Sequence, residues 1–170
     1  MKRVVVLATV CLMALSGNAQ NHYDTKPSEG AANVSNALVS TDYTNLGLSS
    51  GTRWMNSNAP GFYTYEEALL QFKKRLPTKA QWQELRAECQ WTWTGNGYKV
   101  TGPNGNSIVL PAAGYRYCTG SVNGVGAGGD YWSSTPGDSA NAWYLDFGSG
   151  SINVYNFYRC YGFSVRLVQN

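Results

Sequence analysis

Side chains suited to ligand contact are concentrated between residues 139 and 161 of a chain of 170 residues. Tyrosine is common there, and it provides a large contact area at a low cost in side-chain entropy. We therefore predict a ligand-binding surface on this segment, formed by Ser139, Asn141, Tyr144, Asp146, Asn153, Tyr155, Phe157, Tyr158, Cys160 and Tyr161. The alternative is that these residues are ordinary outward side chains of a solvated sheet.

The sequence has no spacing typical of a catalytic or metal site. Its one histidine, His22, lies in a polar stretch, and a calcium site needs six to eight converging oxygen atoms. Paired-carboxylate catalysis would need Asp138 and Asp146 to meet, which nothing in their spacing predicts. The glycines of residues 119–130 lack the strand before and the helix after that a dinucleotide site requires. We expect no catalytic residues, no metal and no cofactor.

The charge of the chain argues against a nucleic-acid partner. It has 13 Lys and Arg residues against 10 Asp and Glu residues. Two of the basic residues, Lys2 and Arg3, belong to a segment that we expect to be removed. The rest form no basic run, so the electrostatic pattern of a nucleic-acid-binding protein is missing.

The N-terminal residues are typical of a secretory signal. A positive start is followed by an apolar run over residues 4–15 and by small residues at 17–19. The apolar run is shorter than the roughly 18 residues of a membrane-spanning helix. Cys11 leaves a lipoprotein anchor as an alternative, although Val10 stands where a small residue is expected.

These features predict three parts of the chain. We expect a signal peptide at residues 1–19, a flexible polar spacer at 20–40 and one domain at 41–170. A short strand at residues 37–39 is an alternative within the spacer. The organisation predicts a secreted or cell-surface protein that meets the membrane only through export; the periplasm is a further location.

Three stretches near the C-terminus alternate with the period of a half-buried strand. They are residues 142–147, 152–157 and 163–168, separated by a glycine-serine turn and a break at 159–162. We predict an antiparallel meander of these three strands. Tyr144 and Asp146 would point away from the core, and Arg166 would also leave it and pair with a carboxylate. The predicted core residues are Trp132, Trp143, Leu145, Ile152, Val154, Phe163, Val165 and Leu167.

Two capping boxes predict two short helices earlier in the chain. In each, a threonine is followed three residues later by Glu or Gln: Thr64 with Glu67, and Thr78 with Gln81. Apolar residues follow at helical spacing in both segments. A turn at Asn96-Gly97 then predicts a hairpin. Residues 107–110 predict a strand, and the glycine-rich residues 119–130 predict a long flexible loop.

Three cysteines follow the expected signal: Cys89, Cys118 and Cys160. The odd number leaves two possibilities open, one disulfide with one free thiol or no disulfide. Cys89 shares a helical stripe with Trp82 and Leu85 and is expected in the core.

Several motifs resemble one known family. YWSS at residues 131–134 and GFSVRLV at 162–168 resemble the C-terminal part of the major paralogous domain proteins of Fibrobacter and gut Bacteroidetes. LGLSSGTRW (46–54), RLPTKAQWQEL (75–85) and VTGPNGNSIVLPAAGYR (100–116) fit the same family in the same order. The resemblance implies a C-type-lectin-like fold of the α+β class, with two short helices, small antiparallel sheets and long loops.

The resemblance also implies a function. Similar folds occur in formylglycine-generating enzymes, which use two cysteines near the C-terminus, but only Cys160 lies in that region here. The EPN or QPD triplet of calcium lectins is missing as well. We expect an exported domain that binds a protein or glycan ligand on a cell or phage surface. A secreted enzyme of the formylglycine-generating or glycan-active type is one alternative, and a structural cell-surface or pilus-tip subunit is another.

Retroelement-diversified variable proteins, which also resemble this chain, randomise adenines in asparagine codons. Such changes produce Tyr, Phe, Cys, Ser and Asp, which are the residue types abundant in NVYNFYRCYGFSVRLV at residues 153–168. The resemblance therefore implies that this surface is diversified by a retroelement, a hypothesis that the codons themselves would decide.

Overall fold

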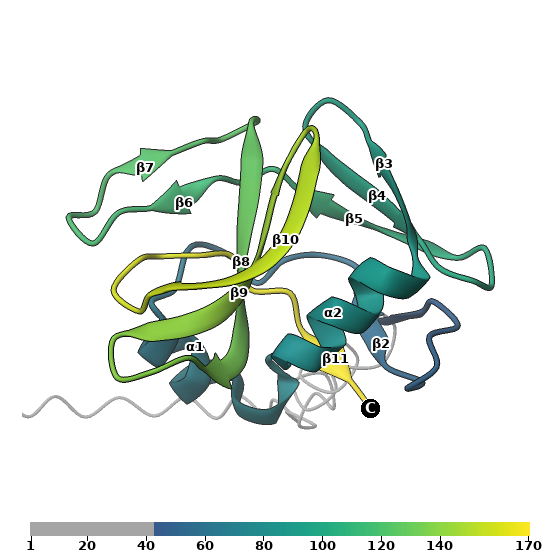
Figure 1. Ribbon diagram of the computed structural model, residues 1–170, viewed down its shortest axis with the longest axis horizontal. Helices are drawn as coiled ribbons and strands as arrows, with labels where there is room; N and C mark the ends of the chain where they lie inside the picture. Colours follow the sequence, from purple (N-terminus) through teal and green to yellow (C-terminus); the bar gives the residue numbers. More distant parts are fainter. Residues whose placement is uncertain (1–42) are drawn as a thin grey trace, which may run out of the picture. The chain divides into compact units, whose positions relative to one another are not determined.

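The computed structural model describes residues 43–170 (Figure 1). The predicted signal peptide, the spacer, its alternative strand and the first two residues of the predicted domain lie outside the described residues. No helix of the described part is long and apolar enough to cross a membrane.

Two short helices begin where the capping boxes predict. They are α1 (Tyr65–Phe72) and α2 (Lys79–Glu88), and the 3-10 turn η1 (Lys73–Arg75) follows α1. The Thr64 hydroxyl accepts a hydrogen bond from the Glu67 backbone N–H at 3.3 Å, and the Glu67 carboxylate accepts one from the Thr64 N–H at 2.8 Å. Thr78 and Gln81 make the same exchange. Both pairs satisfy N–H groups that a helix start leaves without partners.

The described strands form small antiparallel sheets in the orders β1-β2-β11, β3-β4-β5, β10-β9-β8 and β6-β7. With two separate helices, they make an α+β fold, as predicted. The hairpin expected at Asn96-Gly97 joins β3 to β4, and the strand expected at 107–110 is β5. The strands are β1 (Tyr43–Asn45), β2 (Arg53–Met55), β3 (Gln90–Trp93), β4 (Gly97–Thr101), β5 (Ser107–Pro111), β6 (Tyr115–Arg116), β7 (Val122–Asn123), β8 (Gly128–Pro136), β9 (Asn141–Gly148), β10 (Ser151–Tyr158) and β11 (Val168–Gln169).

The sheet of β8, β9 and β10 holds the candidate site. Its middle strand, β9, pairs with β10 along its whole length and with β8 over most of it. This confirms two strands of the predicted meander and the turn between them.

The third predicted strand was wrong. Residues 163–168 do not pair with β10 but reach the opposite edge of the sheet, where Ser164 N–H donates to the Asp130 carbonyl at 2.9 Å. The Trp132 N–H donates to the Ser164 carbonyl at 3.1 Å, and only β11 at the end of this segment is a strand, paired with β2. Period-two alternation shows which residues share a face, but it does not choose the partner strand.

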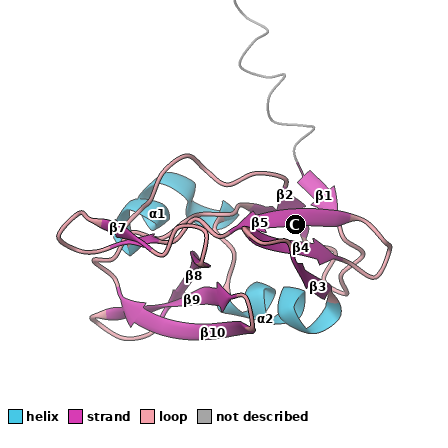
Figure 2. Ribbon diagram, turned by 90° about the horizontal axis from the view of Figure 1, so that it is seen from above, coloured by secondary structure: helices cyan, strands magenta, loops and turns pink. Residues whose placement is uncertain are grey.

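Both faces of this sheet are covered. On one face Tyr131, Leu145 and Phe147 pack into a first core with Trp82 and Leu85 of α2. On the other face Trp132, Ala142 and Tyr144 pack into a second core with Tyr65, Phe72 and Phe163. In Figure 2 the two helices lie apart, with β8 between them. The prediction that Tyr144 points away from the core was therefore wrong, because the second face is also packed and Tyr144 is 8% exposed.

The glycine-rich residues 119–130 were predicted as a flexible loop but contain β7 and the start of β8. β7 pairs with β6 in a short hairpin, with Tyr115 opposite Asn123. Gly114 precedes this hairpin with a φ of 71°, and a Cβ there would strike the Asn123 carbonyl. Glycine is needed at position 114 because the backbone of Asn123 comes so close, and not because this part of the chain must be flexible.

Arg166 was expected to leave the core and pair with a carboxylate, but it is fully buried. Its guanidinium donates to Asn58 Oδ1 at 2.9 Å, to the Met55 carbonyl at 2.7 Å and to the Val109 carbonyl at 2.6 Å. Loss of water lowers its pKa to about 10. Neutral acceptors thus replace the predicted ion pair. Through them Arg166 joins the end of β2 and the loop that follows it to β5.

Cys118 and Cys160 form a disulfide, which resolves the question that the odd cysteine count left open. Cys89 is the free cysteine among the described residues. It follows the last residue of α2 and lies half-buried against the first core, so the predicted core position is met only in part. Burial raises the pKa of its thiol to about 11.

Candidate functional site

A pocket of about 220 Å³ opens on the face of the β8-β9-β10 sheet that carries the second core. Its walls come from three strands of this sheet, from β6 and from the segment after β10. The lining residues are Tyr115, Asp130, Tyr144, Asp146, Phe157, Tyr161 and Phe163. Five of these seven side chains are aromatic and the other two are carboxylates.

A polar row crosses the sheet at the base of this pocket. Asp130 of β8 lies directly opposite Asp146 of β9, and Asp146 lies directly opposite Asn153 of β10. Directly opposed residues on an antiparallel pair have Cβ atoms about 4.5–5.5 Å apart. Strand register therefore brings together two acidic residues that are 16 positions apart in the sequence.

The two carboxylates have no cationic partner within the described residues. The ion pairs found there join Arg116 to Glu67 and Arg159 to Glu66. Asp130 is only 9% exposed, and burial, followed by repulsion from Asp146, raises its pKa to about 7. Burial also raises the pKa of Asp146, while the Asn153 amide opposes that shift. Perturbed carboxylates in a cleft mark a candidate functional site.

Asp130 gives the stability of the fold a pH dependence that can be measured. In the unfolded chain it ionises near its ordinary pKa of 3.8, whereas in the fold it ionises near 7. Between these values the folded protein holds more protons than the unfolded one, so this group lowers the free energy of unfolding as the pH rises from about 4 to 7. The difference of about three pKa units sets an upper limit of ~4 kcal/mol. We expect Asp130→Asn to be more stable than the wild type at pH 8, and to show the smaller difference at pH 4.5.

Urea unfolding of both proteins at pH 4.5, 6 and 8 checks this. Glu66→Gln is the matched control, because it removes an exposed carboxylate outside the pocket and should leave the pH profile unchanged. If Asp130→Asn is no more stable than the wild type at pH 8, the ionised Asp130 carboxylate does not destabilise the fold, and the prediction is wrong.

The aromatic side chains of the pocket touch one another in a closed cycle. Ring centroids are 4.8 Å apart for Tyr161 and Phe157, and 6.3 Å apart for Phe157 and Tyr144. Tyr144 and Phe163 follow at 4.8 Å, and Phe163 and Tyr161 close the cycle at 6.2 Å. Tyr115 extends this wall, with its ring 6.0 Å from that of Tyr161. We refer to Tyr144, Phe157, Tyr161 and Phe163 as the aromatic cycle.

The β6-β7 hairpin and the disulfide support one side of the pocket. The Tyr115 hydroxyl donates to the Tyr117 oxygen at 3.1 Å, and the Asn123 amide donates to the same oxygen at 3.2 Å. This donation raises the pKa of Tyr115 and lowers that of Tyr117. Tyr117 and Tyr161 lie 5.7 Å apart, ring to ring, and they flank the bonded cysteines Cys118 and Cys160. The covalent bond thus ties together two walls of the pocket.

Four of the ten sequence-predicted binding residues line the pocket: Tyr144, Asp146, Phe157 and Tyr161. Asn153 lies next to Asp146 in the polar row. Tyr155 and Tyr158 are exposed by 53% and 54% and lie on β10 beside the pocket. Cys160 is engaged in the disulfide, so its thiol is not a contact group.

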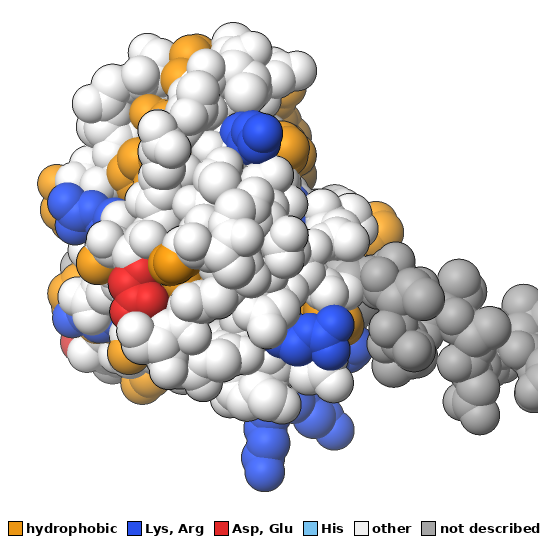
Figure 3. All heavy atoms as spheres, turned by 90° about the vertical axis from the view of Figure 1, so that its right-hand side faces the viewer, with side chains coloured by type: hydrophobic (Ala, Val, Ile, Leu, Met, Phe, Trp, Pro, Cys, Tyr) orange, Lys and Arg blue, Asp and Glu red, His pale blue; other side chains and the backbone are white. Residues whose placement is uncertain are grey.

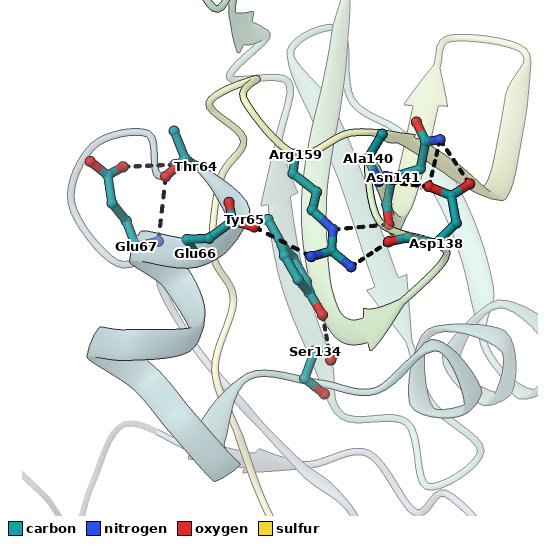
Figure 4. Close-up of polar contacts among 9 residues, drawn as sticks. All are labelled: Thr64, Tyr65, Glu66, Glu67, Ser134, Asp138, Ala140, Asn141 and Arg159. Carbon is teal, nitrogen blue, oxygen red and sulfur yellow. Dashed lines mark hydrogen bonds and ion pairs between the residues drawn. The ribbon is translucent and has the colours of Figure 1, made fainter.

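Ser139 lies in a separate loop between β8 and β9. Asn141 follows this loop as the first residue of β9 (Figure 4). The Asp138 carboxylate accepts hydrogen bonds from the backbone N–H of Ala140 at 2.8 Å and of Asn141 at 2.9 Å. Arg159 donates to the Asn141 carbonyl at 3.2 Å and lies over the ring of Tyr65. These contacts hold the loop, β10 and α1 together, and neither Ser139 nor Asn141 lines the pocket.

Sequence reasoning missed three lining residues. Asp130 and Tyr115 received no role, and Phe163 was predicted as core only. The position of Asp130 directly before Tyr131 and Trp132 was a usable signal, because a charge next to large buried side chains is unusual. Nothing in the sequence placed Tyr115 near β10.

Metal binding gains no support from the described residues, which contain no cluster of three or more His, Cys, Asp or Glu side chains. On the face in Figure 3, Lys and Arg side chains lie in separate places and do not form one continuous patch. One lysine has a specific contact, since Lys79 Nζ lies 3.1 Å from the centre of the Trp143 ring. Trp143, predicted as core, is accordingly half-buried on the side of α2.

Residues 88–168 match a family described as a domain of unknown function (DUF8237). The matched range contains β3 to β10 and all seven pocket-lining residues. The chain matches no curated protein and no solved structure. The match covers the part of the chain that carries the site, and its description gives no activity.

Proposed function

We propose that this protein is an exported ligand-binding domain whose contact surface is the pocket and the exposed part of β10 beside it. The observation that carries the proposal is the composition of the pocket, where two carboxylates without a cationic partner among residues 43–170 lie against five aromatic side chains. Folding alone gains nothing from burying an unpaired carboxylate. A ligand that compensates the carboxylates would offset this cost.

The small volume of the pocket indicates that it holds only one part of a larger ligand. A pocket of about 220 Å³ is smaller than the roughly 300–1,000 Å³ of pockets that enclose a drug-sized molecule. The exposed rings of Tyr155 and Tyr158 extend the contact area outside it. We infer that a terminal group enters the pocket while the rest of a protein or glycan ligand lies across β10.

The disulfide supports the proposal of export. Disulfides persist in secreted, periplasmic and surface proteins and are rare in reducing compartments. The bond between Cys118 and Cys160 therefore fits the secretory signal predicted at residues 1–19. A C-type-lectin-like fold remains our proposal for the finer architecture, supported by the two helices and the order of the resembling motifs.

Removal of either exposed tyrosine is expected to abolish ligand binding without unfolding the domain. Because Tyr155 and Tyr158 are more than half exposed, truncation should change the free energy of unfolding by less than about 1 kcal/mol. Labelled wild-type protein, Tyr155→Ala and Tyr158→Ala would be compared on a printed glycan array and on a peptide array, with unfolding measured in parallel.

Leu70→Ala is the matched control, because Leu70 is exposed on α1 and outside the pocket. It should retain all binding that the wild type shows. Unfolding of the tyrosine variants would assign these residues to the core, and unchanged binding would remove β10 from the contact surface.

Retroelement diversification, if it occurs, would be limited by the structure to a few positions. Cys160 is needed for the disulfide and Tyr144 is packed in the second core, so random replacement at either would damage the fold. Asn153, Tyr155 and Tyr158 could vary at little cost. Sequencing the coding DNA around codons 139–161 tests this: a nearby repeat that differs only at adenines, beside a reverse transcriptase gene, is expected under diversification. Without that repeat the ligand would be fixed.

A second candidate function is hydrolysis, because Asp130 and Asp146 are neighbouring carboxylates in a pocket and both have raised pKa values. The small pocket argues against it, since a glycosidase must bind sugars on both sides of the bond that it cleaves. Incubation with a panel of nitrophenyl glycosides decides between the two. Turnover that is lost in Asp130→Asn would favour hydrolysis over binding alone.

A further inference from the structure

We propose that the pocket binds an organic ammonium group, carried by the ligand, between the carboxylates of Asp130 and Asp146 and the aromatic cycle. This inference rests on the proposed ligand-binding function and specifies the chemistry that enters the pocket.

The first argument is the state of Asp130. Asp130 is 9% exposed and lines the pocket, and its oxygens are not among the fully buried side-chain atoms of residues 43–170 without a partner, so the carboxylate reaches the open space of the pocket. Asp146 faces it from the neighbouring strand and adds a like charge. Two carboxylates side by side repel each other when both are ionised, and a cation bound between them lowers this cost. A positive charge therefore suits this position better than a neutral polar group.

The second argument is the aromatic lining of the same pocket. The rings of the aromatic cycle lie between 4.8 and 6.3 Å from their neighbours, which makes a continuous aromatic surface. Aromatic faces attract cations through their quadrupole, by about 0.5–2 kcal/mol per contact. Several rings together with acidic groups form the arrangement that recognises ammonium groups in other proteins.

The composition of the pocket distinguishes an ammonium from other cations. A hard metal ion needs six or more oxygen ligands, whereas this pocket offers two carboxylates and the described residues hold no larger acidic cluster. Aromatic rings supply no ligands to such an ion, but they make good contact with the methyl or methylene groups next to an ammonium nitrogen. Both a primary amine and a methylated amine satisfy these conditions.

The groups that face the bound nitrogen also predict a pH dependence. They are Asp130 on β8, Asp146 and Tyr144 on β9, Tyr115 on β6 and Tyr161 after β10. Both carboxylates have raised pKa values, so acid removes the attracting charge. Burial, followed by the nearby carboxylates, raises the pKa of Tyr144 above its usual range, which keeps its hydroxyl neutral. Affinity for an ammonium probe should therefore fall as the pH is lowered from 8 to 5.

The exported protein is titrated by NMR with choline and with n-butylamine. The matched uncharged probes are 3,3-dimethyl-1-butanol and n-butanol. We expect each ammonium probe to bind at least tenfold more tightly than its neutral match at pH 8. Asp146→Asn should weaken ammonium binding at least tenfold, and Glu66→Gln, which neutralises an exposed carboxylate outside the pocket, should leave it unchanged. The ratio between choline and n-butylamine identifies a methylated or a primary ammonium as the preferred source.

The outcomes separate this inference from the proposed function. Equal binding of charged and neutral probes, or no effect of Asp146→Asn, would overturn the ammonium assignment. Tighter binding of Ca²⁺ than of either ammonium would overturn it in favour of a metal. If Tyr155→Ala nevertheless loses binding on the arrays, the proposed ligand-binding surface is supported even though the ammonium assignment is wrong. Because Asp130→Asn is expected to stabilise the fold at pH 8, it serves as a second variant if Asp146→Asn fails to fold.

Discussion

Phe163→Ala is expected to lower the free energy of unfolding by about 3–5 kcal/mol, as deletion of a large buried aromatic side chain typically does. Phe163 is 2% exposed, and its ring lies 4.2 Å from that of Trp132 and 4.8 Å from that of Tyr144. Its backbone also exchanges hydrogen bonds with Tyr63 in both directions at 3.0 Å. The alanine variant would leave a cavity between the sheet and the segment that contains Tyr63.

Trp143→Ala provides the comparison for this prediction. The sequence alone placed both Trp143 and Phe163 in the core, which would make their removal equally costly. In the structure Trp143 is half-buried, with Lys79 against its ring, so the expected loss is only about 1–2 kcal/mol. Guanidinium chloride unfolding of both variants checks the ranking. A loss for Trp143→Ala equal to that for Phe163→Ala would contradict the assignment of Phe163 to the more buried position.

Removal of the disulfide is the second change with a large expected effect. Cys118 and Cys160 are 42 residues apart, and closing a loop of that length restricts the unfolded chain by about 4 kcal/mol in the chain-entropy model. We expect the double variant Cys118→Ser, Cys160→Ser to lose stability by about that amount. Unfolding of the wild type with and without a reductant should show a similar difference.

The free cysteine supplies the control for the disulfide experiment. Cys89→Ala removes a half-buried thiol outside the disulfide, so its stability should not depend on the reductant beyond the change seen in the wild type. The double variant should also bind the ammonium probes more weakly. Tyr117 and Tyr161 flank the two cysteines, and Tyr161 lines the pocket. A double variant as stable as the wild type would show that the native contacts alone close this loop.

Local sequence signals predicted the local elements of this protein. The pairs Thr64 with Glu67 and Thr78 with Gln81 determine where the helices begin, because each pair satisfies N–H groups within one turn. Asn96-Gly97 likewise determines a hairpin within a few residues. These signals succeed because all the atoms involved are close in the sequence.

The same kind of reasoning failed where the partner was distant. Residues 163–168 alternate like a strand of the β9-β10 meander, but they lie at the β8 edge because residues 159–162 carry the chain past β10. Arg166 looked like a surface residue and is fully buried, since its acceptors come from Met55, Asn58 and Val109. These acceptors are far from Arg166 in the sequence, so the residues around Arg166 could not predict them.

The candidate site shows most clearly the difference between what local sequence signals predict and what distant contacts decide. The sequence by itself determined that aromatic and polar side chains are concentrated on β9, on β10 and just after β10. This is why Tyr144, Asp146, Phe157 and Tyr161 could be named in advance. Only the tertiary structure decided that Asp130 lies opposite Asp146 and that Tyr115 and Phe163 complete the wall. The physical reason is that composition and alternation are properties of a segment, whereas strand register and the packing of one segment against another are properties of the whole fold.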